Sequence, residues 1–144
     1  MDSIFDSLEI SATGLSAERF RMNTIANNIA NANTVSSTDE GAYRRKSVVF
    51  RTMTDDSFYS SFSSNLQECG VEVKGIVEDK SKPQLKYEPG HPDADENGFI
   101  RLSNVNVLNE MVDMISATRA YEANITAIDS SKSMVKKAIN IGNY

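Results

Sequence analysis

The chain has 144 residues, which suits one domain or two small ones. Fifteen Lys and Arg against twenty Asp and Glu give a formal net charge of −5, which disfavours nucleic-acid binding because that function usually needs a basic face. Leu, Ile, Val and Phe together number only 33 of the 144 residues, so a large self-contained core is not expected.

Residues 3–32 are predicted to form one long helix with a narrow apolar seam of the coiled-coil type. The seam repeats every seven residues at Leu8, Leu15, Met22 and Ile29. Ile25 fills an offset within it. Gly14 interrupts the pattern, and this glycine indicates either a bend or a close contact with another helix.

The end of this helix is rich in asparagine, which is a mediocre helix former. Asn23, Asn27 and Asn31 follow one another at a spacing of four residues. One interpretation is that they lie buried between neighbouring copies and fix the register of the helices. The other interpretation is a solvated polar face.

The middle of the chain has the composition of short strands. Tyr43 to Thr52 is rich in β-branched and aromatic residues, and Val71 to Lys74 alternates with period two. We predict that Leu85 to Tyr87 pairs with the latter strand across a short turn, and that Gly75 marks a bulge. The Ser-rich residues 57–65 are predicted to be a mobile loop.

Residues 91–104 partly match a calcium-binding loop. The matching residues are Asp93, Asp95, Asn97, Gly98 and Ile100. Asn104 stands where a bidentate Glu is needed, and two prolines precede the loop. These departures favour a rigid turn leading into a strand at Phe99 to Leu102.

Catalytic chemistry is not indicated. His91 is the single histidine and Cys69 the single cysteine, and neither lies in a nucleophile motif. The seven glycines are scattered, so there is no phosphate-binding loop. We therefore expect no enzymatic activity, no cofactor and no metal site.

Residues 106–141 are predicted to form a second long helix, because they contain neither Gly nor Pro. The predicted seam is Met111, Met114, Thr118, Tyr121, Ile125, Ile128, Lys132, Val135 and Ile139. Asn106 is a suitable N-cap, and Gly142 is a suitable residue just after the helix.

Together these elements predict an α+β fold in which long N- and C-terminal helices pair as a coiled-coil-like hairpin. Residues 1–36 and 104–144 would form one discontinuous helical assembly domain, and residues 37–103 a small β-rich middle region. Two narrow seams bury little area, so an isolated hairpin would be marginal. We expect weak helicity and fast amide exchange in both helical segments until they assemble.

The N-terminus, MDSIFDSLEI, has no basic residue before Arg19, so no cleaved secretory signal is expected. No apolar run approaches the roughly 18 residues of a membrane span. These features alone favour a cytoplasmic protein that does not insert into membranes.

Four motifs carry a resemblance to a known family. ANNIANANT (26–34) resembles the N-terminal signature of the flagellar basal-body rod proteins, and residues 104–134 resemble the C-terminal signature of that family. AYRRKSVVF (42–50) and YEPGHPDADENGFIRLSNVNV (87–107) resemble its proximal rod members in particular. The order and spacing of the motifs make the resemblance specific.

The resemblance implies a structural subunit of the proximal rod that polymerises helically, transmits torque and encloses the export channel. Its partners would be copies of itself, other rod proteins and the flagellar type III export apparatus. Export without a cleaved signal to the periplasmic rod replaces the cytoplasmic location inferred above. The alternative function is a soluble coiled-coil adaptor, with a calcium-regulated form.

The residues predicted to make subunit contacts are Leu8, Leu15, Met22, Ile25, Asn27, Asn28, Ile29, Asn31, Met111, Met114, Tyr121, Asn124, Ile125, Ile128 and Val135.

Overall fold

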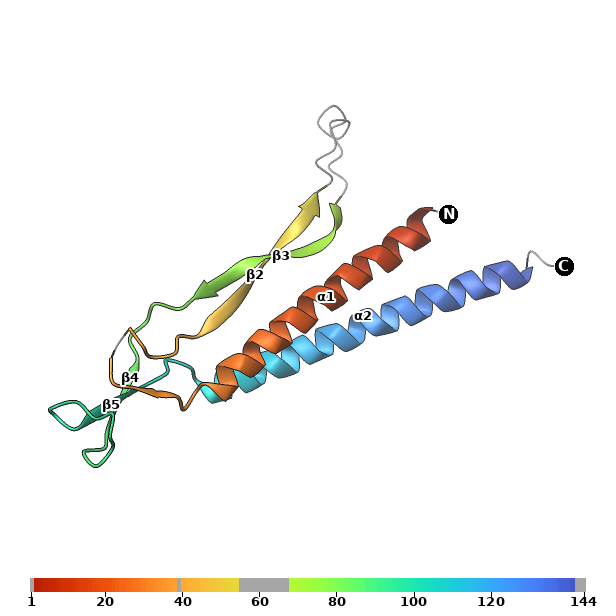
Figure 1. Ribbon diagram of the computed structural model, residues 1–144. Coiled ribbons are helices and arrows are strands. Elements are labelled where there is room, and N and C mark those ends of the chain that lie inside the picture. Colours follow the sequence, from red (N-terminus) through yellow and green to blue (C-terminus); the bar gives the residue numbers. More distant parts are fainter. Residues whose placement is uncertain (1, 39, 55–67, 142–144) are drawn as a thin grey trace. The chain divides into compact units, whose positions relative to one another are not determined.

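The structure is a computed structural model that describes residues 2–38, 40–54 and 68–141 (Figure 1). Its elements in chain order are α1 (Asp2–Ala30), β1 (Val35–Ser36), β2 (Lys46–Thr54), β3 (Glu68–Glu78), β4 (Gln84–Tyr87), β5 (Phe99–Leu102) and α2 (Val107–Ile141). The predicted α+β fold is confirmed, with a long helix toward each end of the chain and a small β insertion between them.

The chain divides into two compact units, each containing part of both helices. The first unit takes the described residues of Met1–Phe20, Val49–Gly75 and Ala117–Tyr144. The second takes those of Arg21–Val48 and Ile76–Ser116. This division by compactness differs from the predicted helical and β-rich domains, which stay a prediction about assembly.

The second unit holds a three-stranded antiparallel sheet in the order β1-β5-β4. In its register, Val35 lies opposite Leu102 and Leu85 lies opposite Arg101. The apolar core of this unit includes Ile25, Ile100 and Val105, each at most 5% exposed. Three well-buried branched side chains give this unit a core of its own, although a small one.

The predicted pairing of Leu85 to Tyr87 with the preceding strand is wrong, because β4 pairs with β5 and β3 pairs with β2. Asp79 N–H donates to the Arg45 carbonyl at 2.8 Å, beyond the end of β3. Asn104 Nδ2 then donates to the Ser81 hydroxyl at 2.8 Å and to the Asp79 carbonyl at 3.2 Å. These contacts turn the chain away from β3 before β4 begins.

The other predictions for the middle region concern the start of β2, Gly75 in β3 and the loop at residues 57–65. The strand predicted from Tyr43 begins at Lys46, and β3 runs through Gly75 without ending. The bulge at Gly75 stays a prediction, and the glycine of β3 with a positive φ is Gly70, at 126°. The predicted mobile loop at residues 57–65 lies outside the described residues.

Gly70 brings β3 close to α1 within the first unit. A Cβ added at this glycine would lie 2.3 Å from Thr13 Oγ1. The same hydroxyl accepts a hydrogen bond from Val71 N–H at 3.1 Å and donates one to the Ile10 carbonyl at 2.7 Å. Thr13 therefore satisfies an N–H group of β3 from the surface of the helix.

The buried residues described in the first unit are all small: Ser11, Ala17, Gly70, Ala117 and Ser131. A Cβ added to Gly14 of α1 would lie 3.0 Å from Asn124 Nδ2 of α2. Of the two interpretations of Gly14, the close helix contact is therefore confirmed. Close approach admits small residues and leaves the larger apolar side chains outside.

The helix seam predicted from large apolar residues in α2 is corrected only in part, because Met114, Tyr121, Ile128 and Val135 are half-buried, as a seam requires. The inward positions, which repeat every seven residues, are Glu110, Ala117, Asn124 and Ser131. Met111 and Ile125 lie one position further along and are 53% and 39% exposed. A prediction based on large apolar residues therefore missed a helix contact that small and polar residues make.

The predicted N-cap of α2 is confirmed, since Asn106 Oδ1 accepts hydrogen bonds from Leu108 and Asn109 N–H at 3.0 and 3.2 Å. The predicted Gly142 cap lies outside the described residues. Neither described helix is long and apolar enough to cross a membrane.

Candidate assembly site

Asn28 lies at the centre of a polar cluster in the second unit and is fully buried. Its Nδ2 donates to the Lys46 carbonyl and to Glu110 Oε2, both at 2.8 Å. Its Oδ1 accepts from Tyr43 OH and from Lys46 N–H, both at 3.0 Å. Both donors and both acceptor positions of the amide are thus used. Asn28 joins α1 to α2 and to the start of β2.

Glu110 is the second fully buried member of this cluster. Arg45 Nε donates to Glu110 Oε1 at 2.6 Å, and Arg45 Nη2 lies 3.0 Å from Asp113 Oδ2. One guanidinium therefore pairs with two carboxylates that are three residues apart on α2. A buried carboxylate is tolerated only when it is paired in this way.

The protonation of the cluster follows from these contacts. The hydrogen bond to Glu110 raises the pKa of Arg45, so the guanidinium stays charged. Burial, together with the negative charges of Glu110 and Glu78, raises the pKa of Tyr43 above its ordinary value. Tyr43 therefore keeps the proton that it donates to Asn28.

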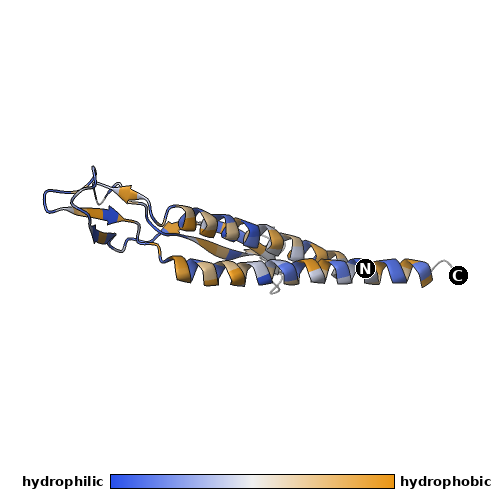
Figure 2. Cartoon of the chain, turned by 90° about the horizontal axis from the view of Figure 1, so that it is seen from below, coloured by the Kyte–Doolittle hydropathy of each residue, from blue (hydrophilic) through white to orange (hydrophobic). Residues whose placement is uncertain are grey.

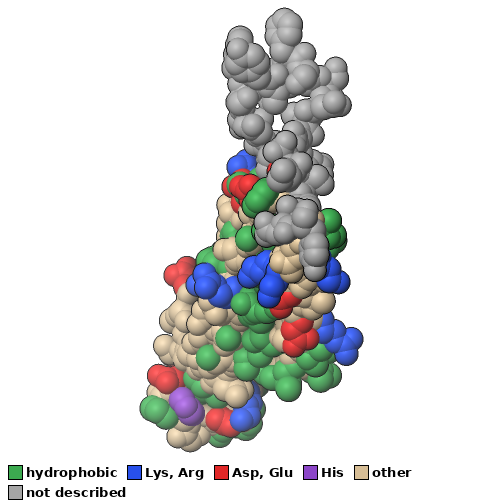
Figure 3. Space-filling view, turned by 90° about the vertical axis from the view of Figure 1, so that its right-hand side faces the viewer, with side chains coloured by type: hydrophobic (Ala, Val, Ile, Leu, Met, Phe, Trp, Pro, Cys, Tyr) green, Lys and Arg blue, Asp and Glu red, His purple; other side chains and the backbone are tan. Residues whose placement is uncertain are grey.

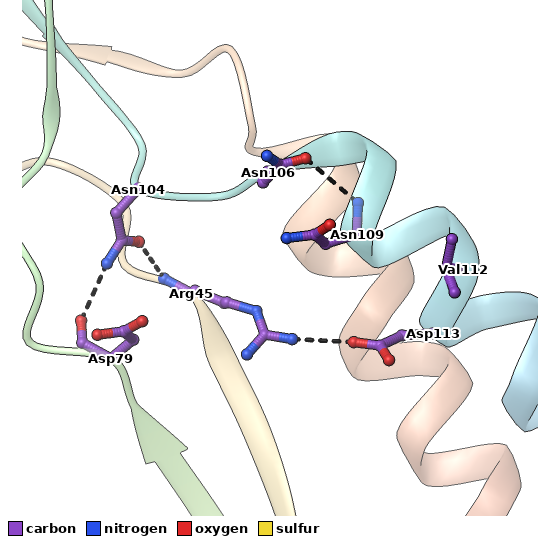
Figure 4. Close-up of a pocket in the computed structure, with 7 residues that line it drawn as sticks. All are labelled: Arg45, Asp79, Asn104, Asn106, Asn109, Val112 and Asp113. Atoms are coloured by element: carbon purple, nitrogen blue, oxygen red, sulfur yellow. Dashed lines mark hydrogen bonds and ion pairs between the residues drawn. The ribbon is translucent and has the colours of Figure 1, made fainter.

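A pocket of about 480 Å³ lies beside this cluster in the second unit (Figure 4). Figure 4 shows the Arg45 side chain reaching Asp113 on α2, while Asn104 stands between the Arg45 backbone and Asp79. The charged and amide groups along its wall pair mainly with one another. Such pairing is typical of a structural contact.

The outward face of α2 in the same unit carries large apolar side chains. Leu108, Met111, Val112 and Ile115 are 71%, 53%, 60% and 56% exposed. Figure 2 shows that hydrophobic positions recur along the length of α2. The spacing of three and four residues places these four side chains on one face. A contiguous exposed apolar face of this kind marks an interaction surface.

The predicted contact residues differ in how exposed their side chains are in the subunit. Ile25 and Asn28 are buried, whereas Asn27, Met111 and Ile125 are exposed. Half-buried are Leu8, Leu15, Met22, Ile29, Asn31, Met114, Tyr121, Asn124, Ile128 and Val135. Contacts of any of them with other subunits stay a prediction.

The asparagines of this segment differ in their contacts within the subunit. Asn28 is not one of the asparagines spaced by four residues (Asn23, Asn27 and Asn31). Its hydrogen bonds join elements of the same subunit. Asn31 Nδ2 donates to the Asn27 carbonyl of the same helix at 2.8 Å. Asn27 has an exposed side chain. Sequence reasoning missed Glu110, although it shares a seven-residue spacing with Ala117.

The acidic segment forms a turn into β5, which spans Phe99–Leu102 as predicted. Asp95 Oδ1 accepts hydrogen bonds from Asn97 N–H at 2.9 Å and from Phe99 N–H at 3.0 Å. Gly98 has a φ of 81°, and its N–H donates to the Asp95 carbonyl at 2.9 Å. The carboxylate of the calcium-like motif therefore caps a turn.

Replacing Asp95 by Ala is expected to destabilise the chain at pH 7 and to matter less in acid. The hydrogen bond from Phe99 N–H, helped by Asn97 and Arg101, lowers the pKa of Asp95 in the folded state. Its contribution is therefore present above the unfolded-state pKa and is lost as the pH falls through the folded-state pKa. Urea unfolding at pH 7 and at about pH 2 to 3 tests this.

Asp93 provides the matched control for that experiment, since its side chain is exposed and accepts no backbone hydrogen bond within the described residues. Asp93→Ala should leave the midpoint of unfolding nearly unchanged at both pH values. Equal losses for the two variants at pH 7 would refute the role given to Asp95.

Comparisons with known proteins show the family of this chain. Residues 8–35 match the model of the flagella basal body rod protein, and residues 96–141 match that of the flagellar basal body rod FlgEFG protein C-terminal region. The chain is 44% identical to the flagellar basal-body rod protein FlgC of Borreliella burgdorferi, over 96% of this chain and 97% of that relative. The chain belongs to the FlgC family of flagellar basal-body rod proteins.

Two further rod-family relatives show the same full-length match. FlgC of Bacillus subtilis is 40% identical, over 96% of this chain and 97% of the relative. FlgC of Salmonella typhimurium is 36% identical, over 97% of this chain and 98% of the relative. The chain is accordingly a structural subunit of the flagellar rod, and the alternative of a soluble coiled-coil adaptor is not supported.

The two matched segments contain the two fully buried members of the polar cluster, whereas Tyr43, Arg45 and Lys46 lie between the segments. Asn28 lies in the matched residues 8–35, and Glu110 lies in the matched residues 96–141. Their hydrogen bond joins positions that are 82 residues apart. In this rod-family chain the cluster connects the two terminal segments within one subunit.

Proposed function

We propose that the chain builds the proximal, periplasmic part of the rod by packing the outward faces of α1 and α2 against copies of itself and other rod proteins. The observation that carries the proposal is the exposed apolar face of α2 at Leu108, Met111, Val112 and Ile115. Large apolar side chains at more than half exposure on one helix face need a partner. A helical assembly supplies that partner along the whole helix.

The small core of the subunit supports the proposal that the chain is exported unfolded through the flagellar type III apparatus. Among the described residues, the buried apolar residues larger than alanine are Ile25, Ile100 and Val105, each at most 5% exposed. A chain with so little buried apolar surface unfolds easily. In the rod, the packed helices would line the export channel and carry torque, with no catalytic role.

Replacing both Met111 and Ile115 by Glu is expected to stop rod assembly while leaving folding and export normal. Both side chains are more than half exposed in the subunit, so the free energy of unfolding should change by about 0.5 kcal/mol or less. In an apolar contact the added carboxylates would be buried without partners. Imaging of basal bodies and a swimming assay, in a strain lacking the native chain, measure the result.

The matched control is the double variant Met111→Leu and Ile115→Leu, which keeps the face apolar at similar volume. It should form rods and swim. Complete rods and normal swimming with the two glutamates would refute the proposed contact.

A further inference from the structure

An apolar groove of about 250 Å³ lies in the first unit, between the start of α1 and the end of α2. Phe5 and Leu8 of α1 form one side, and Val135 and Ile139 of α2 form the other. Phe5 is 61% exposed and Ile139 is 60% exposed. The groove therefore presents apolar surface that the subunit does not cover.

Two lysines, Lys132 and Lys136, line the same groove. They are four residues apart on α2, so their ammonium groups lie on one side of the helix, one turn apart. Neither forms an ion pair with the described residues. Figure 3, which faces the ends of both helices, shows hydrophobic side chains at the surface beside Lys and Arg. An apolar groove with a basic rim fits an apolar helix face flanked by acids.

The start of α1 carries such a face. Asp6 and Glu9 are exposed, three residues apart, and in no ion pair with the described residues. Ile10, which follows directly, is 43% exposed. Residues 2–10 contain three acidic residues and no basic residue. The two acids are thus spaced by one turn, as are the two lysines.

We propose that this groove binds the Asp6, Glu9 and Ile10 face of α1 from a second copy of the chain. The isoleucine would enter the groove, and the two carboxylates would pair with Lys132 and Lys136. The assignment rests on the proposed function, because it concerns contacts between copies in the rod. It identifies the partner as a second copy of the chain, and it says which charged groups would pair across the contact.

Mixed-copy cross-linking tests the proposal in assembled rods. Two differently tagged copies, both with Cys69→Ser, are expressed together in a strain lacking the native chain. One copy carries Ile10→Cys and the other carries Lys136→Cys. Treatment of purified basal bodies with a short bismaleimide should give a product containing both tags. The control pair, Ile10→Cys with Ala123→Cys, should give at least about tenfold less product.

Charge exchange provides the second arm. Lys132→Glu with Lys136→Glu should reduce rod number strongly, and Asp6→Lys with Glu9→Lys in the same chain should restore it. Tagged chains present in rods without a mixed-tag product, or cross-linked only to another rod protein, would overturn the second-copy assignment. Absence of the unsubstituted tagged chain from rods would instead contradict the proposed function.

Discussion

Asn28→Leu is expected to lower the free energy of unfolding of the second unit by about 3–5 kcal/mol. The amide makes four hydrogen bonds to Tyr43, Lys46 and Glu110. Leucine removes all four and leaves buried polar groups without partners, each at about 1–3 kcal/mol. Because Glu110 is fully buried, weakening its partners is especially unfavourable.

Asn27→Leu is the matched control, since it makes the same change one residue earlier at an exposed side chain. Its free energy of unfolding should stay within about 0.5 kcal/mol of the native chain. Urea unfolding of the isolated chain, followed by circular dichroism and tyrosine fluorescence, measures both variants. Equal unfolding midpoints for the two variants would contradict the central place of Asn28.

The Asn27→Leu variant also distinguishes an effect on folding from an effect on rod assembly. The sequence predicts that Asn27 and Asn31 lie between neighbouring subunits. The side chain of Asn27 is exposed in the subunit and is therefore accessible to a neighbour. Asn28→Leu should harm the subunit itself, whereas Asn27→Leu should act only on rod formation. The same two variants therefore distinguish a defect within the subunit from a defect between subunits.

Local signals in the sequence were sufficient for the helices, for the N-cap at Asn106 and for the strand at Phe99–Leu102. Each of these depends on residues within a few positions of one another. The partner of β4 was predicted wrongly because strand pairing is non-local. Asn104, for example, holds the chain that leads into β4 by bonding to Asp79 and Ser81, more than twenty residues away.

The polar cluster was missed for a related reason. Hydrophobic periodicity assigns the helix contact to residues such as Met111, whereas Glu110 and Ala117 are the fully buried residues and Asn124 lies against Gly14. A seven-residue repeat of small and polar residues was visible in the sequence. This repeat can form a helix contact because Gly14 lets the two helices approach closely. No local sequence rule predicts that Gly14 lies against Asn124.

The structure also refines which part of the isolated chain should be ordered. The second unit buries Ile25, Ile100 and Val105, whereas the described first unit buries only small residues. Burial of small residues contributes little apolar stabilisation. The helical ends at residues 2–20 and 117–141 should therefore open readily in the free subunit and become ordered when neighbours cover them.

Amide hydrogen exchange of the isolated chain and of purified rods tests this central claim most directly. In the isolated chain, residues 2–20 and 117–141 should exchange at nearly unprotected rates, while residues 25–28 and 100–110 are protected. In rods, protection of both helical ends should rise by about a hundredfold or more. Equal protection of these ends in the free chain and in the rod would contradict the account.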